Sequence, residues 1–172
     1  MSAPIDRWNK PESYPKNWEE RSKVAAKRIR PGESVLDVGS GSMVLHGLIP
    51  ETCFYFSMDA TDKWGATYIL DLNAATLPDF PGPFDVVTMI GVIEYIHDTE
   101  RLFDRVAACA SKGIVLTYAA ENWMPDIDRA YNGWVNTLKT GDILNSMKVR
   151  GFKCVGGYDN WHNHLVARFD KI

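Results

Sequence analysis

Residues 34–42 read Ser-Val-Leu-Asp-Val-Gly-Ser-Gly-Ser, a short apolar run that closes on Asp37 and passes into a glycine-rich loop. An apolar run of this length predicts a strand, and Gly39 and Gly41 predict a sharp turn after it. The turn leads into a short helical segment over 43–48. In an open α/β sheet, a nucleotide-like ligand binds at the carboxyl end of the first strand. The stretch therefore predicts that strand and a ligand site directly after it.

Short apolar runs alternate with connecting segments along the rest of the chain. The run Phe84–Ile90 (FDVVTMI) is apolar throughout, as expected for a strand buried on both faces of a parallel sheet. No helix is predicted between the last two strands, so they should pair as an antiparallel hairpin. We predict an α/β, doubly wound, mostly parallel seven-stranded sheet with a C-terminal antiparallel hairpin. The other predicted strands are 54–58, 67–70, 114–118, 152–155 and 164–169, and the predicted helices are 17–30, 98–110 and 140–149.

The predicted helices have recognisable ends. Asn17, Asp98 and Thr140 carry side chains that can cap a helix at its N-terminus. Lys112-Gly113 is predicted to end the second of these helices, because glycine is a common helix terminator. The pattern thus predicts three helices, each bounded by its own local signals.

The charge of the chain is nearly balanced, with 19 Lys and Arg against 22 Asp and Glu and a formal net charge of −3. Domains that bind duplex nucleic acid present a basic face, so no nucleic-acid partner is expected. The locally basic stretch 21–30 fits the solvated side of a helix. No apolar run approaches the roughly 18 residues that span a bilayer, and no secretory signal is evident. We expect one cytoplasmic domain with no membrane partner, as a monomer or homodimer.

Carboxylates and glycines recur at the ends of the later strands. Met58-Asp59-Ala60 closes the second strand, 22 residues after Asp37, where a carboxylate can accept both hydroxyls of a ribose. Asp71-Leu72 follows the third strand, where the carboxylate can accept an exocyclic amine while the leucine packs on a ring. Residues 91–97 (GVIEYIH) follow the fourth strand. All of these positions fall at the same edge of the predicted sheet.

In their order along the chain, these motifs resemble those of the class I S-adenosylmethionine-dependent methyltransferases, in particular the small bacterial enzymes called type 11. The resemblance rests on DVGSGS at 37–42, MD at 58–59, DL at 71–72 and FDVVTMIGVIEYIHD at 84–98. One departure is Met43, which stands where the family usually has a third glycine. The resemblance implies S-adenosylmethionine as cofactor and methyl transfer as the reaction.

The resemblance also implies roles for individual residues. The glycine loop would pass the methionine part of the cofactor, with Asp37 near its amino group, and Gly91 would line the methyl donor. Asp59 would bind the ribose, and Asp71 with Leu72 would hold the adenine. The full set of expected cofactor residues is Asp37, Gly39, Ser40, Gly41, Asp59, Ala60, Asp71, Leu72 and Gly91.

The acceptor side is less marked in the sequence. His97 is the best-placed general base, with Tyr95 and Glu94 as alternatives on the same loop. Residues 1–16 form an arm and residues 119–139 a connection long enough to be a lid. We expect a small-molecule acceptor methylated at oxygen or nitrogen, such as a saccharide or a biosynthetic intermediate. The aromatic and polar residues expected to line its site are Tyr14, Trp18, Arg21, Trp123, Met124, Asp126, Asp128, Tyr131 and Trp134.

The sequence leaves two alternative functions and one potential metal site to consider. A non-catalytic binding or regulatory subunit would account for the irregular glycine motif. A nicotinamide oxidoreductase is disfavoured because Val44 occupies the position of the third glycine in the dinucleotide fingerprint. His162 and His164 are predicted to share a face of a late strand near Asp159, but such a pair is weak ground for a metal site, and no metal is expected.

Overall fold

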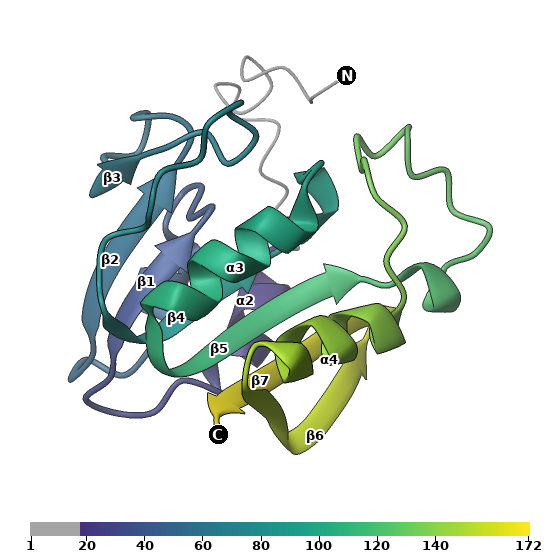
Figure 1. Ribbon diagram of the computed structural model, residues 1–172. Coiled ribbons are helices and arrows are strands. Elements are labelled where there is room, and N and C mark those ends of the chain that lie inside the picture. The colour runs from purple at the N-terminus through teal and green to yellow at the C-terminus, as the bar shows by residue number, and fades with distance from the viewer. Residues whose placement is uncertain (1–17) are drawn as a thin grey trace.

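The computed structural model describes residues 18–172, and within them seven strands form one sheet in the order β3-β2-β1-β4-β5-β7-β6 (Figure 1). β7 runs antiparallel to both of its neighbours, and β1 to β5 pair in parallel. The predicted mostly parallel sheet with a C-terminal antiparallel hairpin is confirmed. The strands are β1 (Ser34–Val38), β2 (Phe54–Asp59), β3 (Tyr68–Ile69), β4 (Phe84–Ile90), β5 (Ala110–Ala119), β6 (Phe152–Trp161) and β7 (His164–Lys171).

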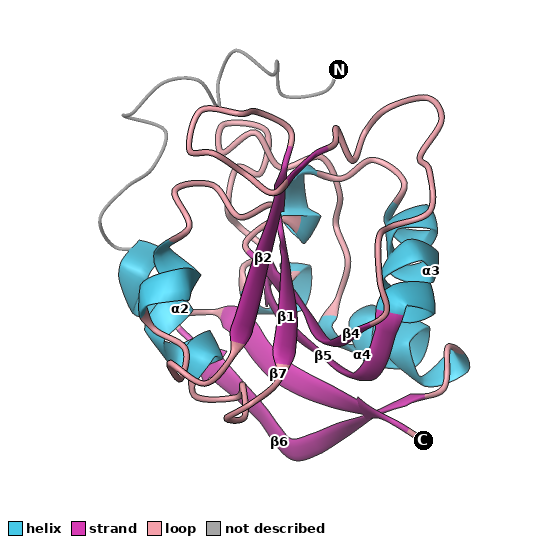
Figure 2. Cartoon of the chain, turned by 90° about the vertical axis from the view of Figure 1, so that its left-hand side faces the viewer, coloured by secondary structure: helices cyan, strands magenta, loops and turns pink. Residues whose placement is uncertain are grey.

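Helices cover both faces of the sheet, as the doubly wound prediction requires. α2 (Trp18–Ala26) lies on one face, and α3 (Thr99–Cys109) and α4 (Thr140–Val149) lie on the other (Figure 2). The loops that directly follow β1 and β4 contain short 3-10 helices, at Val44–Gly47 and Ile93–Tyr95, and α3 begins only after the second of them. The upper edge of the sheet in both views is therefore built mainly from loops.

The core divides into two layers because side chains alternate along buried strands. Val86 of β4 and Val115 of β5 pack with Ala25 on the α2 side. Val87 and Leu116, one position further along, pack in the larger layer under α3 and α4. All five side chains are fully buried, which explains why the strands read as continuous apolar runs.

The helix ends follow the prediction only in part. Asp98 caps α3 as predicted, because its carboxylate accepts a 3.0 Å hydrogen bond from the Arg101 N–H. α2 ends at Ala26 and not at residue 30, since turns occupy the next residues. The predicted cap Asn17 lies outside the described residues. Thr140 is the first residue of α4 and not its cap.

Two strands are longer than predicted. β5 begins at Ala110, so Lys112 and Gly113 lie inside a strand and do not terminate a helix, which corrects the prediction. β6 continues to Trp161 because Gly156 and Gly157, both with positive φ, form a bulge after which the pairing with β7 resumes. The strand predicted over 152–155 therefore extends beyond the two glycines, because the pairing with β7 continues after the bulge.

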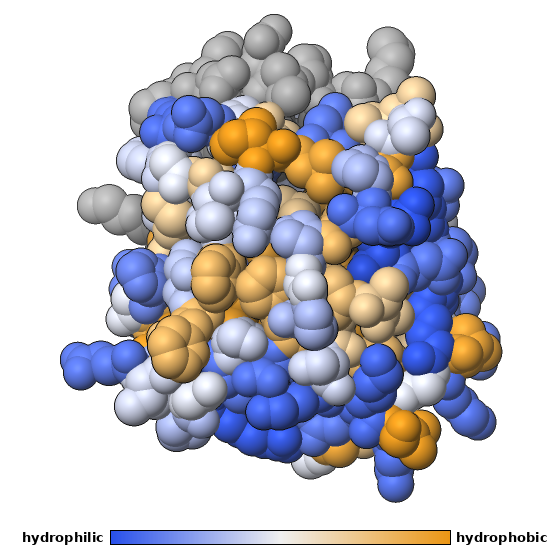
Figure 3. Space-filling model, turned by 60° about the vertical axis from the view of Figure 1, so that its left-hand side comes forward, coloured by the Kyte–Doolittle hydropathy of each residue, from blue (hydrophilic) through white to orange (hydrophobic). Residues whose placement is uncertain are grey.

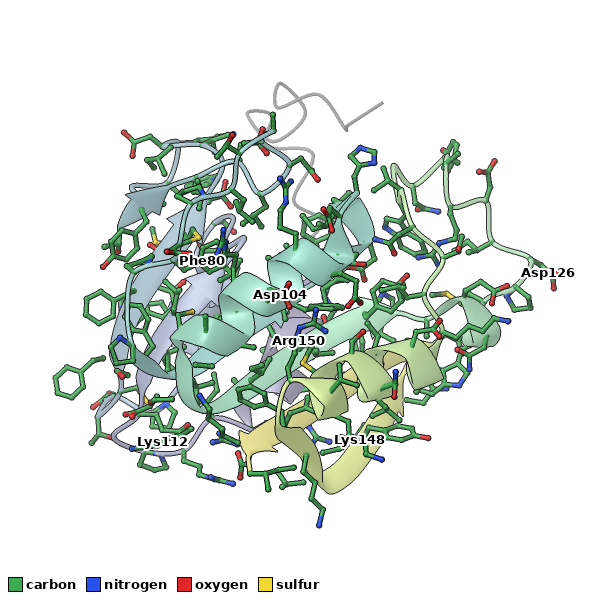
Figure 4. The ribbon with its side chains drawn as sticks, viewed as in Figure 1. Phe80, Asp104, Lys112, Asp126, Lys148 and Arg150 are labelled. Carbon is green, nitrogen blue, oxygen red and sulfur yellow. The ribbon has the colours of Figure 1, made fainter. Side chains whose placement is uncertain are left out.

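α3 and α4 are tied together by charges at their exposed sides. Arg150, at the end of α4, pairs with Asp104 at 2.7 Å and with Glu100 at 2.9 Å, both on α3. Asp104 and Arg150 face each other between the two helices in Figure 4.

None of the helices in residues 18–172 has the length and apolar character needed to cross a membrane.

β3 forms one edge of the sheet and contributes only two residues to it. The face over β2 and β3 mixes apolar and polar side chains (Figure 3), and Phe54 and Ile69 are exposed. Because the edge strand is so short, little unpaired backbone is available there for a further strand.

Candidate active site

The carboxyl ends of β1, β2 and β4 lie at the same edge of the sheet, and most of the predicted site residues gather there. Asp59 ends β2, and its Oδ2 accepts a 2.9 Å hydrogen bond from the Gly41 N–H in the loop after β1. Its Oδ1 accepts a 3.1 Å bond from the Thr61 N–H. The Thr61 hydroxyl adds a weaker bond of 3.4 Å to the same Oδ1. A carboxylate has about four acceptor positions, so acceptor capacity remains for a ligand. The structure thereby joins two motifs that are separate in the sequence.

Gly39 shapes the loop after β1. Its φ is +70°, and its N–H donates a 2.7 Å bond to the Met58 carbonyl, which folds the loop back on β2. A Cβ at this position would overlap the side chain of Val92, so only glycine fits. The neighbouring Ser40 Oγ is buried and finds no hydrogen-bond partner within residues 18–172, which leaves it able to bind a ligand.

Asp37 lies beneath this loop and not on its surface. The Thr88 hydroxyl donates to Oδ1 at 2.6 Å, and the Tyr55 hydroxyl donates to Oδ2 at 2.7 Å. Burial raises the pKa of Asp37 to about 6, although the two hydroxyl bonds work in the opposite direction. Tyr55 and Thr88 had no motif signal, since they reach Asp37 only from the strands on either side of β1.

Replacing Asp37 by asparagine is expected to change how stability depends on pH. The native pKa of about 6 exceeds the ordinary 3.8, so the native state holds the Asp37 proton more tightly than the unfolded chain does. The wild type should therefore lose up to about 3 kcal/mol of unfolding free energy from this group as pH rises from about 4 to about 7. The asparagine variant, which cannot ionise, should not lose it.

Urea unfolding of both proteins at several pH values measures this effect. The free energy of unfolding of Asp37→Asn, measured relative to that of the wild type, should rise between about pH 4 and pH 7. Asp71→Asn, at an exposed position, is the control and should keep the wild-type pH dependence. Parallel curves for the wild type and Asp37→Asn would contradict the assignment.

The loop after β3 is tied to the loop after β4. Asp71 is exposed, whereas Leu72 is buried in the larger core layer. Asn73, the next residue, donates from Nδ2 to the Tyr95 carbonyl at 2.9 Å and accepts at Oδ1 from the His97 N–H at 3.0 Å. Asn73 is a positioning residue that no motif marked, and its only sequence signal is its place directly after Asp71-Leu72.

The three candidate bases on the loop after β4 have different surroundings. His97 is exposed and Tyr95 is half-buried. Glu94 is only 1% exposed, and its Oε1 accepts a 2.8 Å bond from the Ala119 N–H. Glu94 therefore lies inside the protein, which disfavours it as the alternative general base, whereas His97 and Tyr95 remain accessible. Gly91, with φ +66°, begins the loop and donates to the Thr117 hydroxyl at 2.9 Å.

Arg21 belongs to the basic stretch expected on the solvated side of a helix and also to the residues expected to line the acceptor site, and the first expectation is wrong for this residue. Arg21 is 8% exposed, and its guanidinium lies against Gly91, where an added Cβ would overlap it. Its guanidinium carbon also lies 5.4 Å from the centre of the Trp18 ring. Burial lowers the pKa of Arg21, and the nearby Glu94 and Tyr95 act in the opposite direction. The packing of α2 thus brings a cation to the site.

The sequence of residues 12–156 matches the family described as methyltransferase domain. The match covers most of the chain. This chain belongs to the methyltransferase family. S-adenosylmethionine is the cofactor of this family, as the sequence motifs implied, and the nicotinamide alternative is set aside. No curated protein sequence matches the chain.

Solved structures share the fold of this methyltransferase at low sequence identity. Magnesium protoporphyrin IX methyltransferase from Synechocystis, bound to S-adenosylmethionine, has a TM-score of 0.68 and 16% identity, covering 99% of this chain and 92% of that one. A putative methyltransferase from Haloferax volcanii, in complex with the activator Trm112, has a TM-score of 0.73 and 13% identity over 91% and 90%. The [4+2]-cyclase SpnF has a TM-score of 0.64 and 15% identity over 82% and 58%. Proteins with different named reactions thus share this architecture.

In this methyltransferase, residues 120–139 are held against the loop after β4. Asn136 donates from Nδ2 to the carbonyls of Ile93 and Ile96, at 2.6 and 2.9 Å. Arg129 in turn donates to the Asn136 carbonyl at 2.6 Å. The segment predicted as a lid is therefore bonded to the site loop through groups that carry no motif.

The side chains of this segment differ in their exposure to solvent. Trp134 turns toward the sheet, with its ring 4.8 Å from the Arg129 guanidinium carbon and 6.5 Å from the His164 ring. Tyr131 is 88% exposed, and Asp126 lies at the outer end of the segment (Figure 4). Trp134 thus packs against other residues of the protein, whereas Tyr131 and Asp126 are exposed to solvent.

His162 lies in the turn between β6 and β7, and His164 is the first residue of β7, so the two do not share one strand face, which corrects the prediction. His164 Nδ1 lies 3.1 Å from the His162 carbonyl. Since a carbonyl only accepts, Nδ1 carries the hydrogen. Burial lowers the pKa of His164, so its ring is neutral near pH 7. Among the described residues, no three His, Cys, Asp or Glu side chains gather where they could hold a metal.

Proposed function

We propose that this protein transfers a methyl group from S-adenosylmethionine to an oxygen or nitrogen atom of a small-molecule acceptor. The observation that carries the proposal is the hydrogen bond from Gly41 to Asp59. It joins the glycine loop after β1 to the carboxylate after β2, at the edge where open α/β sheets bind nucleoside ligands. A small acceptor is supported by one structural neighbour, whose name gives magnesium protoporphyrin IX as its substrate.

The residues present fit the cofactor. The acceptor capacity left on Asp59, next to Ala60, suits a ribose hydroxyl. Gly39, Ser40 and Gly41 provide close backbone approach and an unpartnered hydroxyl for the methionine part. The adenine is assigned to the exposed Asp71 and the adjoining Leu72, and the methyl donor to Gly91.

Bound S-adenosylmethionine supplies a methyl group activated by its sulfonium. The chain has to align the acceptor and exclude water, which can lower the barrier by several kcal/mol. We assign proton removal from an acceptor hydroxyl or amine to His97, whose backbone is held by Asn73 while its ring is exposed. Tyr95, on the same loop, is assigned to orienting that acceptor.

Calorimetric titration with S-adenosylhomocysteine tests the cofactor site. The wild type should bind at micromolar concentration, and Asp59→Ala should bind about 10- to 100-fold more weakly, because charge-assisted hydrogen bonds to the ribose are lost. Asp62→Ala removes an exposed carboxylate three residues away and should bind like the wild type. Absence of binding by the wild type would reject the proposed function.

Replacing His97 by alanine should lower turnover and leave S-adenosylhomocysteine affinity unchanged. We expect turnover to fall about tenfold or more. This is a small effect for the loss of a general base, because water can reach an exposed position and partly replace the side chain. The measurement is transfer of labelled methyl to a panel of small hydroxyl and amine acceptors. His162→Ala, exposed on the β6–β7 turn, is the control. Wild-type turnover in His97→Ala would remove this histidine from the reaction.

A further inference from the structure

His164 has no role in the proposed function, although it lies at the same edge of the sheet as the residues assigned to the cofactor. It begins β7 and pairs with Ala119 at the end of β5, and because the two strands are antiparallel these two ends share that edge. β4, which Gly91 follows, is the next strand beyond β5. Neighbouring strands are about 4.8 Å apart, so the strands next to Gly91 and His164 are separated by about 10 Å. A single small molecule can span this distance.

One nitrogen of the His164 ring is open to a ligand. Nδ1 donates to the His162 carbonyl at 3.1 Å, so Nε2 carries a lone pair in the neutral ring. Within residues 18–172, Nε2 makes no hydrogen bond. The residue is half-buried, which leaves it within reach of a ligand from solvent. The start of β7 therefore presents a hydrogen-bond acceptor of fixed orientation.

Two tryptophans from different segments stand around this ring. The Trp161 ring, at the end of β6, lies 5.9 Å from the His164 ring, and the Trp134 ring meets it edge-on at 6.5 Å. Both tryptophans are half-buried, so each keeps part of its surface exposed. We call Trp134, Trp161 and His164 the aromatic cluster. Aromatic surface around one polar group is typical of sites for small molecules, because the rings contribute binding energy and the polar group fixes the orientation.

Two contacts connect the aromatic cluster with the loop after β4. The Val135 N–H donates a 2.8 Å hydrogen bond to the Glu94 carbonyl, which holds the tryptophan of residues 120–139 beside that loop. Arg21 lies against Gly91, and its charge also acts on His164. The aromatic cluster therefore adjoins the loop to which the methyl donor is assigned.

The surroundings of His164 favour a neutral ligand. Burial lowers the pKa of this histidine, Glu94 acts in the opposite direction, and Arg21 adds to the effect of burial. A position that disfavours a proton on the ring also disfavours the ammonium group of a ligand, and a carboxylate has no hydrogen to donate to Nε2. A hydroxyl on an aromatic ring meets both conditions, because it is a donor that stays neutral near pH 7, with a pKa of about 10 in tyrosine.

We propose that the aromatic cluster binds the methyl acceptor and selects an aromatic ring that carries a hydroxyl group. The hydroxyl donates to His164 Nε2, and the ring packs against Trp134 and Trp161. The end of the acceptor that points toward Gly91 carries the oxygen or nitrogen atom that is methylated. The inference rests on the proposed function and narrows its acceptor to hydroxylated aromatic compounds. His164 is a binding residue here, and proton removal stays with His97.

Binding of model compounds to the protein saturated with S-adenosylhomocysteine tests the inference. Saturation-transfer NMR compares 2-naphthol with 2-methoxynaphthalene, which has no hydroxyl hydrogen, and with cyclohexanol, which has no aromatic ring. The wild type should bind 2-naphthol about fivefold or more tightly than either, because only 2-naphthol offers both the hydrogen bond and the ring. His164→Phe keeps a ring but no acceptor and should lose the preference for 2-naphthol over 2-methoxynaphthalene. His164→Gln, whose side-chain carbonyl accepts, should recover part of it.

Two further variants test the tryptophan contact. Trp134→Ala should weaken the binding of both naphthalenes about fivefold, whereas Phe54→Ala, which removes a ring that is 66% exposed at the opposite edge of the sheet, should weaken neither. Unchanged affinity for S-adenosylhomocysteine shows that each variant is folded.

The inference fails if the wild type does not bind 2-naphthol, or binds either comparison compound as tightly. It also fails if His164→Phe keeps the wild-type preference or if Trp134→Ala binds both naphthalenes as the wild type does. The proposed function fails only if the wild type does not bind S-adenosylhomocysteine, so the two failures are distinct.

Discussion

Replacing Arg168 by methionine is expected to lower the free energy of unfolding by about 3–5 kcal/mol, because it leaves a buried carboxylate without its cation. Arg168 on β7 donates two hydrogen bonds to Glu33, of 2.7 and 3.0 Å. The two side chains are only 4% and 5% exposed. After the substitution, the Glu33 carboxylate keeps only the 2.8 Å bond from the Arg30 N–H.

Urea unfolding with linear extrapolation measures this loss. Arg30→Met is the matched control, because Arg30 pairs with Asp170 at 2.7 Å but is 56% exposed, and such pairs contribute about 1 kcal/mol or less. The double variant Glu33→Gln/Arg168→Met should lose less than the two single losses added together, since the residues interact directly. A loss below about 1 kcal/mol in Arg168→Met would show that water compensates the pair.

Replacing Gly39 by alanine is expected to weaken S-adenosylhomocysteine binding about 100-fold or more. A positive φ of +70° costs an L-residue about 1–2 kcal/mol, and the new Cβ would overlap Val92. The loop has to move to relieve this overlap, and a displacement of about 1 Å in a binding loop can cost 10²-fold. The loop carries the backbone groups assigned to the methionine part, so the loss should appear directly in affinity.

Calorimetric titration compares Gly39→Ala with Gly47→Ala. Gly47 lies in the 3-10 helix after the same loop, has no positive φ and has open space where a Cβ would be placed. Its variant should therefore bind S-adenosylhomocysteine as the wild type does. Equal affinities for the two variants would mean that the ligand does not use this loop.

Predictions from sequence were best where local chemistry decides the outcome. The capping of α3 by Asp98 and the positive φ of Gly39 depend on neighbouring residues, and both are found in the structure. The strand predicted over 152–155 was too short, because a bulge at Gly156 and Gly157 is possible only when a paired strand, here β7, lies alongside.

In the candidate site, too, the features set by neighbouring residues were predicted and the contacts between distant segments were missed. The motif residues Asp59 and Gly41 were placed correctly at one edge, because parallel strands bring their carboxyl ends together. Asn73 and Tyr55 were missed, since each acts on a residue from a different segment of the chain. Arg21 was expected both in a basic stretch on a solvated helix side and in the acceptor site, and only the packing of α2 decides that it is buried.

The sequence by itself determined the family, the order of strands and helices along the chain, and the positions of the glycines and carboxylates at the edge of the sheet where the cofactor is proposed to bind. These follow from periodicity, turn geometry and motif order, which are properties of neighbouring residues. Only the tertiary structure decided that Asp37 is buried between two hydroxyls, that Glu94 lies inside the protein and that Arg21 faces Gly91. Burial and pairing of charges depend on segments far apart in the chain, because it is their packing that removes water from a side chain.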